Sequence, residues 1–206
     1  AVPFTALAQQ GDGTDVRAAV HTFKPAKTEA TARRVAALKV PDGFQVNVFA
    51  QGLLNPRIIA VAPEGQIYVS RRDQGDVLLL QDRNEDGALD GEPRVVFARP
   101  GAHGLAIAQG HLYIATATDV YRAPIKADGT LGPEERIIND LPDGGQHPNR
   151  TLAFGPDGML YISVGSSCNA CNETNPEHAT LLRATPDGKT RSIFASGLRN
   201  TIGFAW

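Results

Sequence analysis

Short apolar segments separated by turns recur along this chain at a regular spacing. Each copy has an apolar strand, a turn, and a second strand that ends in small or hydroxyl residues, and the copies cover residues 58–70, 104–115 and 151–163. A further copy begins at Thr201 and reaches Trp206. The starts lie roughly 46 to 50 residues apart, which is the period of four-stranded propeller blades. The pattern predicts an all-β fold, a β-propeller of which this chain covers about three blades plus the start of another.

Other apolar stretches fill the intervals between these copies. Four of them predict third and fourth strands of successive blades: residues 76–80, 94–97, 119–122 and 135–138. Residues 44–49 alternate apolar and polar side chains and predict one more strand. Residues 1–35 are polar and patternless apart from a short helix expected around 28–38, so they predict an N-terminal arm before a propeller domain at 36–206.

The number of blades has a physical consequence. A propeller protects its sheet edges and apolar faces by closing a ring of typically four to eight blades. About three blades would leave such faces open. We therefore expect the chain to be the N-terminal half of a larger propeller, with the remainder needed to close the fold.

Composition narrows the class of partner. The chain has 206 residues, 42% of them apolar, and a net charge of -2, so it offers no basic stripe for nucleic acid. No apolar run approaches the roughly 18 residues that span a bilayer, and no membrane span is expected. Residues 1–8 end in an Ala-x-Ala pattern that resembles the tail of a signal peptide but lacks a basic n-region. Small molecules are the expected partners.

Cys168 and Cys171 lie close together in a loop rich in Asn, Gly and Ser. One Cys-x-x-Cys could supply half a zinc site, but no second pair completes it, and the loop does not have the strand-to-helix setting of a thioredoxin-like redox pair. A local disulfide is favoured over two free thiols, because it would stiffen a long loop in an oxidising compartment. This favours a periplasmic or secreted location.

Residues 141–150 form a loop that runs directly into the apolar strand of the third copy. Loops that lead into the innermost strand of a blade lie at the mouth of the central channel, where ligands bind. This loop carries His147, whose ordinary pKa near 6.5 suits proton abstraction at neutral pH. The alternative is that His147 only hydrogen-bonds the turn.

Neighbouring blades carry polar residues at corresponding places. His103 precedes the apolar strand of the second copy, and Arg199 and Asn200 precede that of the last one. A guanidinium with five donors and an amide that both donates and accepts suit an anionic or carbonyl-rich ligand. The repeat therefore predicts that these side chains and His147 converge on one channel mouth. Inherited turn motifs and surface capping of backbone carbonyls are the alternatives.

Residues 82–90 match the start of an EF-hand-type calcium loop. Oxygen ligands alternate along such a loop, and a glycine at the sixth position allows the sharp turn. Position twelve is Pro93 instead of a bidentate glutamate, which would weaken the site, and a solvated hairpin is the alternative. The expected metal ligands are Asp82, Asn84, Asp86 and Asp90.

Several of these segments together resemble a known family. Residues 145–165, beginning Gly-Gln-His-Pro-Asn-Arg, with 197–200 and 203–206, resemble the pyrroloquinoline quinone (PQQ) dependent sugar dehydrogenases. Residues 166–171 and 40–44 resemble the sorbosone dehydrogenase-like branch more than the soluble glucose dehydrogenase. The resemblance covers about residues 36–206.

The resemblance implies a six-bladed propeller with the quinone across the channel mouth. His147 would be the general base on a sugar or sugar-aldehyde hydroxyl while hydride passes to the quinone. Arg199 would serve catalysis and cofactor binding, with Asn200 a further cofactor contact. The repeat register adds His103 as a cofactor-binding residue that lines the channel. PQQ and calcium are the implied cofactors, and the electron acceptor could be a cytochrome.

The chain departs from soluble glucose dehydrogenase in two places. Ser166 stands where that enzyme has an aspartate, and Ala102 lies in a loop where it has a glutamine, so its substrate contacts are not carried over. Two other functions stay open. A non-enzymatic propeller could bind a glycan or a protein at the channel mouth, and a metal-dependent lactonase-type propeller would need converging carboxylates there.

Overall fold

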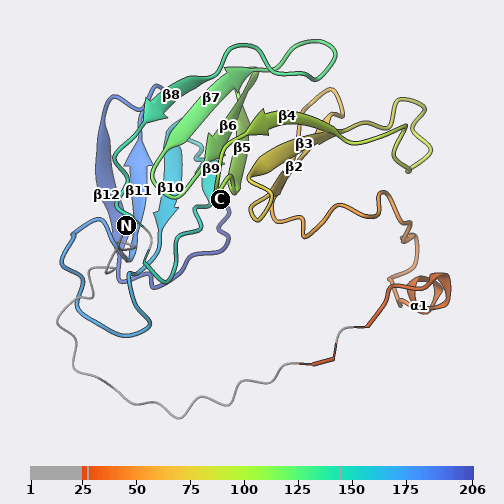
Figure 1. Ribbon diagram of the computed structural model, residues 1–206, viewed down its shortest axis with the longest axis horizontal. Coiled ribbons are helices and arrows are strands. Elements are labelled where there is room, and N and C mark those ends of the chain that lie inside the picture. Colours follow the sequence, from red (N-terminus) through yellow and green to blue (C-terminus); the bar gives the residue numbers. More distant parts are fainter. Residues whose placement is uncertain (1–24, 27, 144) are drawn as a thin grey trace, which may run out of the picture.

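The computed structural model describes residues 25–26, 28–143 and 145–206, and within them three four-stranded antiparallel sheets follow one another along the chain (Figure 1). The first contains β1 (Ile59–Val61), β2 (Ile67–Arg71), β3 (Asp76–Leu80) and β4 (Arg94–Ala98). The second contains β5 (Gly104–Ala108), β6 (His111–Ala115), β7 (Val120–Pro124) and β8 (Glu135–Ile138). The third contains β9 (Leu152–Phe154), β10 (Leu160–Val164), β11 (Thr180–Ala184) and β12 (Arg191–Ser196).

Each sheet is a meander in which strands adjacent in sequence pair with one another. The innermost strand β5 packs beside β1 on one side and β9 on the other. This is the arrangement of propeller blades, and it confirms the prediction of an all-β propeller with about three blades. A register shift between the third and fourth strands recurs in all three blades, near the start of β3, β7 and β11.

The apolar core lies between the blades. Alternate residues of a strand point to opposite faces, so the middle blade contributes to two separate clusters. Leu112 and Ile114 of β6 pack with Tyr68 and Leu79 of the first blade. Tyr113, on the opposite face of β6, packs in a cluster with residues of the third blade. Burial on both faces explains why the middle strands read as nearly continuous apolar runs.

The hydroxyl residues that end the second strand of a repeat have a structural role. The Ser163 backbone N–H donates to Thr151 O (3.0 Å), and the Thr151 N–H donates to Ser163 Oγ (2.7 Å). In the first blade, Ser70 and Ile58 make the same two contacts, at 2.9 and 3.1 Å. The hydroxyl thus satisfies a backbone donor just before the innermost strand, where a regular ladder has not yet begun.

The blades are also joined by polar contacts next to the innermost strands. Ser70 Oγ donates to His103 O (2.7 Å), which connects the first blade to the second. The His103 ring Nδ1 lies 2.8 Å from Arg150 O, which connects the second blade to the third. A Cβ on Gly104 would lie 2.6 Å from Arg150 O, so this backbone approach requires glycine.

Two predicted strands are absent from the structure. Residues 44–49 form no strand, because they find no partner strand among the described residues and the side chains of Phe44, Val46 and Val48 stay exposed. Residues 201–206 also form no strand. An innermost strand pairs with the second strand of its own blade, and residues 201–206 have no such partner among the residues that the structure describes. The Trp206 ring packs instead on Tyr161, with centroids 4.5 Å apart.

The described part of the predicted arm contains one short helix, α1 (Ala32–Ala36), shorter than the expected 28–38. It has no buried residue and lies apart from the three sheets (Figure 1). Residues 1–24, with the signal-peptide-like pattern, lie outside the described residues. None of the helices in the described ranges has the length and apolar character needed to cross a membrane.

The contact at His103 predicts a pH dependence of stability. Burial lowers the pKa of His103 from its ordinary 6.5, and the charges of Arg57 and Arg72 lower it further against the opposing hydrogen bond to Arg150 O. The unfolded state therefore takes up this proton at a higher pH than the folded state. Neutral His103 therefore makes its full contribution to the free energy of unfolding above the pKa that this histidine has in the unfolded state, about 6.5. That contribution is lost as the pH falls below this value.

We expect the melting temperature of the wild-type protein to fall between pH 7 and pH 5, and His103→Asn to reduce this fall. The Asn amide can replace the Nδ1 donor but does not titrate. His111→Asn, at a half-buried histidine of β6, is the matched control and should keep the wild-type pH dependence. Thermal denaturation at a series of pH values checks this, and an unchanged fall in His103→Asn would contradict it.

Candidate functional site

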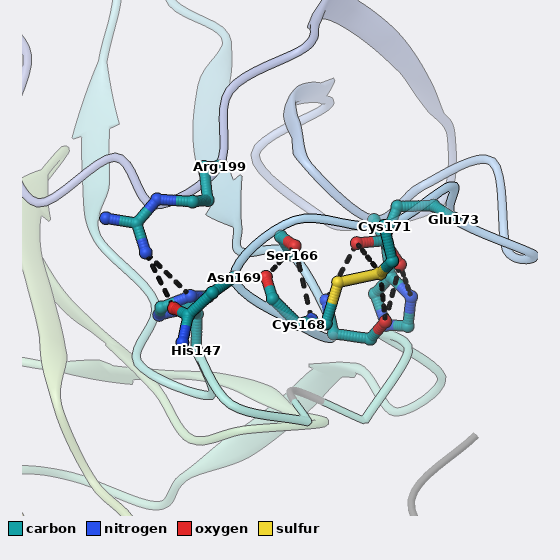
Figure 2. The surroundings of a disulfide bond; sticks show 9 residues. His147, Ser166, Cys168, Asn169, Cys171, Glu173 and Arg199 are labelled. Atoms are coloured by element: carbon teal, nitrogen blue, oxygen red, sulfur yellow. Dashed lines mark hydrogen bonds and ion pairs between the residues drawn. A yellow bond between two sulfur atoms is a disulfide. The ribbon is translucent and has the colours of Figure 1, made fainter. Parts of the chain in front are cut away.

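His147 and Arg199 meet at the ends of two loops that the repeat places at equivalent positions. His147 lies in the loop before β9, and Arg199 follows β12. Arg199 Nη1 donates to His147 Nε2 (3.2 Å) and to Asn169 Oδ1 (2.9 Å), as Figure 2 shows. Residues from two successive repeats and from the loop between β10 and β11 therefore form one polar cluster.

The contact defines the protonation of His147. A guanidinium only donates hydrogen bonds, so His147 Nε2 must be the acceptor, and a neutral ring then carries its proton on Nδ1. The imidazole is half-buried. Its Nε2 therefore has the lone pair that a general base needs, and in this arrangement Arg199 occupies that lone pair.

Arg199 itself has neutral partners. Its side chain is exposed, and no carboxylate of the described residues lies within ion-pair distance of it. A guanidinium that is hydrogen-bonded only to an imidazole and an amide keeps its full positive charge available to an anionic ligand. The cluster thus pairs a neutral base with a cation.

The loop that carries His147 is held by a buried arginine. Arg150 is fully buried, and burial lowers its pKa to about 10, so it stays charged at neutral pH. Its guanidinium donates to three backbone carbonyls, those of Ala117 (2.9 Å), Pro142 (2.5 Å) and His147 (3.5 Å). Arg150 therefore satisfies the carbonyls of a tight loop from the inside.

The loop after β10 contains a disulfide between Cys168 and Cys171, as predicted, and no cysteine is free among the described residues. The two sulfur atoms lie near the Glu173 carboxylate, but as disulfide sulfurs they are not metal ligands. Glu173 accepts hydrogen bonds from the Ser167 N–H (2.9 Å) and Ser167 Oγ (2.8 Å). This carboxylate braces the loop from within.

The other predicted site residues lie in different settings. Asn200 is half-buried next to Arg199. His103 is only 4% exposed, and its Nδ1 is directed to the backbone carbonyl of Arg150. It therefore joins the second blade to the third. Its contact with a cofactor and that of Asn200 stay predictions.

Residues 82–90 fold into a compact turn between β3 and β4. Asp82 accepts from the N–H groups of Asp86 (3.2 Å) and Gly87 (2.9 Å), and Asp90 accepts from Arg83 N–H (2.6 Å). Within the described ranges, the carboxylates of this turn do not converge into a three-ligand cluster. Calcium binding there stays a prediction.

Two residues of the site were missed by sequence reasoning. Asn169 lies between the two cysteines of the Cys-x-x-Cys segment, where the sequence indicates no role for it, and it contacts Arg199 only because the chain folds back. Arg150 lies directly before the innermost strand, at the repeat position that holds His103 and Asn200 in the neighbouring copies. This shared repeat position indicates a special role for Arg150, but it does not indicate that the side chain is buried.

The fold and the cluster define a β-propeller with two functional side chains on the loops next to its inner strands. These are the neutral imidazole of His147 and the guanidinium of Arg199, which has no carboxylate partner among the described residues. The sequence profile of the TrAA12-like family matches residues 38–206, and the chain belongs to this family. A search of curated proteins gave no match.

Several solved structures are similar to this chain. A Trichoderma reesei carbohydrate-active enzyme of family AA12, in its iodide structure, is 25% identical, with a TM-score of 0.60 over 73% of this chain and 40% of that chain. The holo PQQ domain of pyranose dehydrogenase from Coprinopsis cinerea is 19% identical, with a TM-score of 0.67 over 79% and 43%. The PQQ-bound aldose sugar dehydrogenase from Streptomyces coelicolor is 24% identical, with a TM-score of 0.52 over 69% and 48%.

These similarities confirm the resemblance to PQQ-dependent sugar dehydrogenases and the propeller fold. This chain spans less than half the length of each of these three structures. The activity, substrate and partners of the whole protein are therefore matters for proposal.

Removal of the buried guanidinium is expected to destabilise the protein strongly. Arg150→Ala leaves the carbonyls of Ala117, Pro142 and His147 without their donor, and we expect a loss of about 3 to 5 kcal/mol in the free energy of unfolding. Arg136→Ala, at an exposed arginine in a 3.4 Å pair with Asp119, is the control and should cost less than about 1 kcal/mol. Urea denaturation measures both, and similar losses would refute the structural role of Arg150.

Proposed function

We propose that the protein to which this chain contributes three blades is a PQQ-dependent dehydrogenase that oxidises a sugar or a sugar aldehyde. The observation that carries the proposal is the 3.2 Å contact between Arg199 Nη1 and His147 Nε2, which brings a base and a cation together on neighbouring loops. Family membership and the propeller fold support it, because similar solved propellers include PQQ-bound sugar dehydrogenases.

The residues present fit the cofactor. PQQ is an anionic, carbonyl-rich molecule, and Arg199 offers an exposed guanidinium without a carboxylate partner among the described residues. Asn200 adds an amide beside it. When bound, PQQ would supply the acceptor for the hydride that leaves the substrate carbon.

His147 and Arg199 would then have separate tasks. Arg199 would turn part of its donor set from His147 to the anionic oxygens of the ligand, which releases the Nε2 lone pair. His147 Nε2 would take the proton of the substrate hydroxyl. The electron density gained on that oxygen would favour loss of hydride from the carbon that bears it. The fixed charge of Arg199 would stabilise the negative charge that arrives beside it.

The proposal also covers the type of substrate, the location, the electron acceptor and the metal. The Ser-Ser-Cys-Asn-x-Cys segment at 166–171 supports a sorbosone-type substrate. The Cys168–Cys171 disulfide supports a periplasmic or secreted location, because such bonds persist in oxidising compartments. A cytochrome is the proposed electron acceptor, and calcium the proposed metal.

The roles of His147 and Arg199 predict different losses in the complete protein. His147→Ala should lower kcat by about 10² to 10⁴-fold, the usual contribution of a general base, and leave the Kd for PQQ within about threefold. Arg199→Ala should weaken PQQ binding and lower kcat. PQQ titration of the apo protein and sugar-dependent dye reduction measure the two effects.

Equal losses of PQQ binding in the two variants would contradict the assigned roles. A wild-type protein that retains no quinone absorbance after desalting, and reduces no dye with any sugar, would instead favour a non-enzymatic propeller. Lys126→Ala, at a residue on the turn between β7 and β8, is the control for nonspecific effects and should change neither quantity.

Calcium binding to the turn at 82–90 predicts a rise in stability. A ligand that binds only the folded state raises the melting temperature with its concentration. We expect millimolar calcium to raise the melting temperature of the wild-type protein more than that of Asp82→Asn or Asp86→Asn, which remove ligand charge. Magnesium at equal concentration is the ionic-strength control. An equal rise in wild type and variants would place the calcium elsewhere.

A further inference from the structure

We propose that Asn169 is the positioning residue for Arg199, and that the Cys168–Cys171 disulfide holds Asn169 in place. Asn169 Oδ1 accepts from the same Nη1 nitrogen of Arg199 that donates to His147 Nε2. Figure 2 shows the amide and the imidazole side by side below the guanidinium. Because two acceptors, His147 Nε2 and Asn169 Oδ1, bind the same nitrogen, they define both the position and the orientation of the guanidinium plane. One acceptor alone would leave the plane free to rotate.

The backbone of the disulfide loop holds both other loops of the site. The Ser166 N–H donates to Arg199 O (2.7 Å), and the Gln146 N–H donates to Ser167 O (3.0 Å). A Cβ on Gly165 would lie 2.5 Å from His147 Cβ, so the loop and the histidine are in direct contact there. The disulfide loop is thus the common support for the loops of His147 and Arg199.

A buried polar pair anchors the far end of the same loop. His178 is 8% exposed, and its Nε2 lies 2.7 Å from Asp143 O in the loop of His147. Its Nδ1 lies 3.1 Å from Glu173 Oε2, and Glu173 in turn accepts from Ser167. The loop is therefore fixed at 166–167 and at 173–178, and the disulfide closes the short exposed segment between them that presents Asn169.

The disulfide matters because Asn169 lies on an exposed stretch of the loop, where burial does not fix its position. A bond between Cys168 and Cys171 restricts the conformations of the two residues it encloses, Asn169 and Ala170. Without it, the amide would sample many positions and Arg199 would keep only its contact with His147. Reduction of the disulfide should therefore act on the site through Asn169.

The consequence for the cofactor rests on the proposed function, but the positioning itself can be measured without PQQ. In the apo protein, we expect a guanidinium held by two acceptors to rotate slowly enough for its Nη protons to give resolved NMR signals. The Arg199 signals are identified by their absence in Arg199→Ala. We expect Asn169→Ala, and the Cys168→Ser/Cys171→Ser double variant, to lose them. Asn169→Asp, which keeps an acceptor oxygen, and Asn172→Ala, at an exposed residue of the same loop, should retain them.

The second measurement is a double-mutant cycle on the Kd for PQQ. If Asn169 acts through Arg199, Asn169→Ala should weaken PQQ binding by about tenfold in the wild-type background, the usual effect of one charge-assisted hydrogen bond. It should have no further effect in the Arg199→Ala background. A role in loop stability alone would give the same loss in both backgrounds and a lower melting temperature.

The outcomes separate the two proposals. Retention of the Arg199 signals in Asn169→Ala overturns the positioning role, whether or not PQQ binds. Loss of those signals in a wild-type-like fold, together with no PQQ binding by the wild type, supports the positioning role and refutes the proposed function. If the cysteine double variant fails to fold, the Asn169 variants, which leave the disulfide intact, decide the positioning role alone.

Discussion

Burial of each blade face against the next blade is the constraint on which the rest of this structure depends. Around β6 the middle blade is buried on both faces, because β6 sends Leu112 and Ile114 toward the first blade and Tyr113 toward the third. Side chains of period two thus fix the angle and spacing of neighbouring sheets. The inner strands are brought together, and the backbone at Gly104 touches Arg150 O so closely that no side chain fits.

The loops at the end of these inner strands inherit that spacing. His147 and Arg199 are 52 residues apart, and they meet because each lies just before the inner-strand position of its repeat, in two successive repeats. Buried polar groups then define each loop: Arg150 collects three carbonyls inside the loop of His147, and Glu173 with His178 closes the disulfide loop. These polar groups fix the loops because a buried polar group without a hydrogen-bond partner would lower the stability of the folded protein.

Sequence reasoning was accurate where the pattern is local. The third strand of the first blade and the fourth strand of the second were predicted at 76–80 and 135–138, with the bounds that the structure shows for β3 and β8. It failed for residues 44–49, which alternate like a strand but have no partner among the described residues. Alternation reports that a segment could form a strand, whereas pairing depends on a neighbour that lies elsewhere in the chain.

The sequence by itself determined the blade period, the nearness of Cys168 to Cys171, and the register that places His147 and Arg199 on neighbouring loops. These are properties of spacing along the chain. Only the tertiary structure decided that Asn169 shares a donor with His147 and that His103 joins blades from a buried position. Such contacts depend on how loops from different blades fold over one another, which no spacing in the sequence specifies.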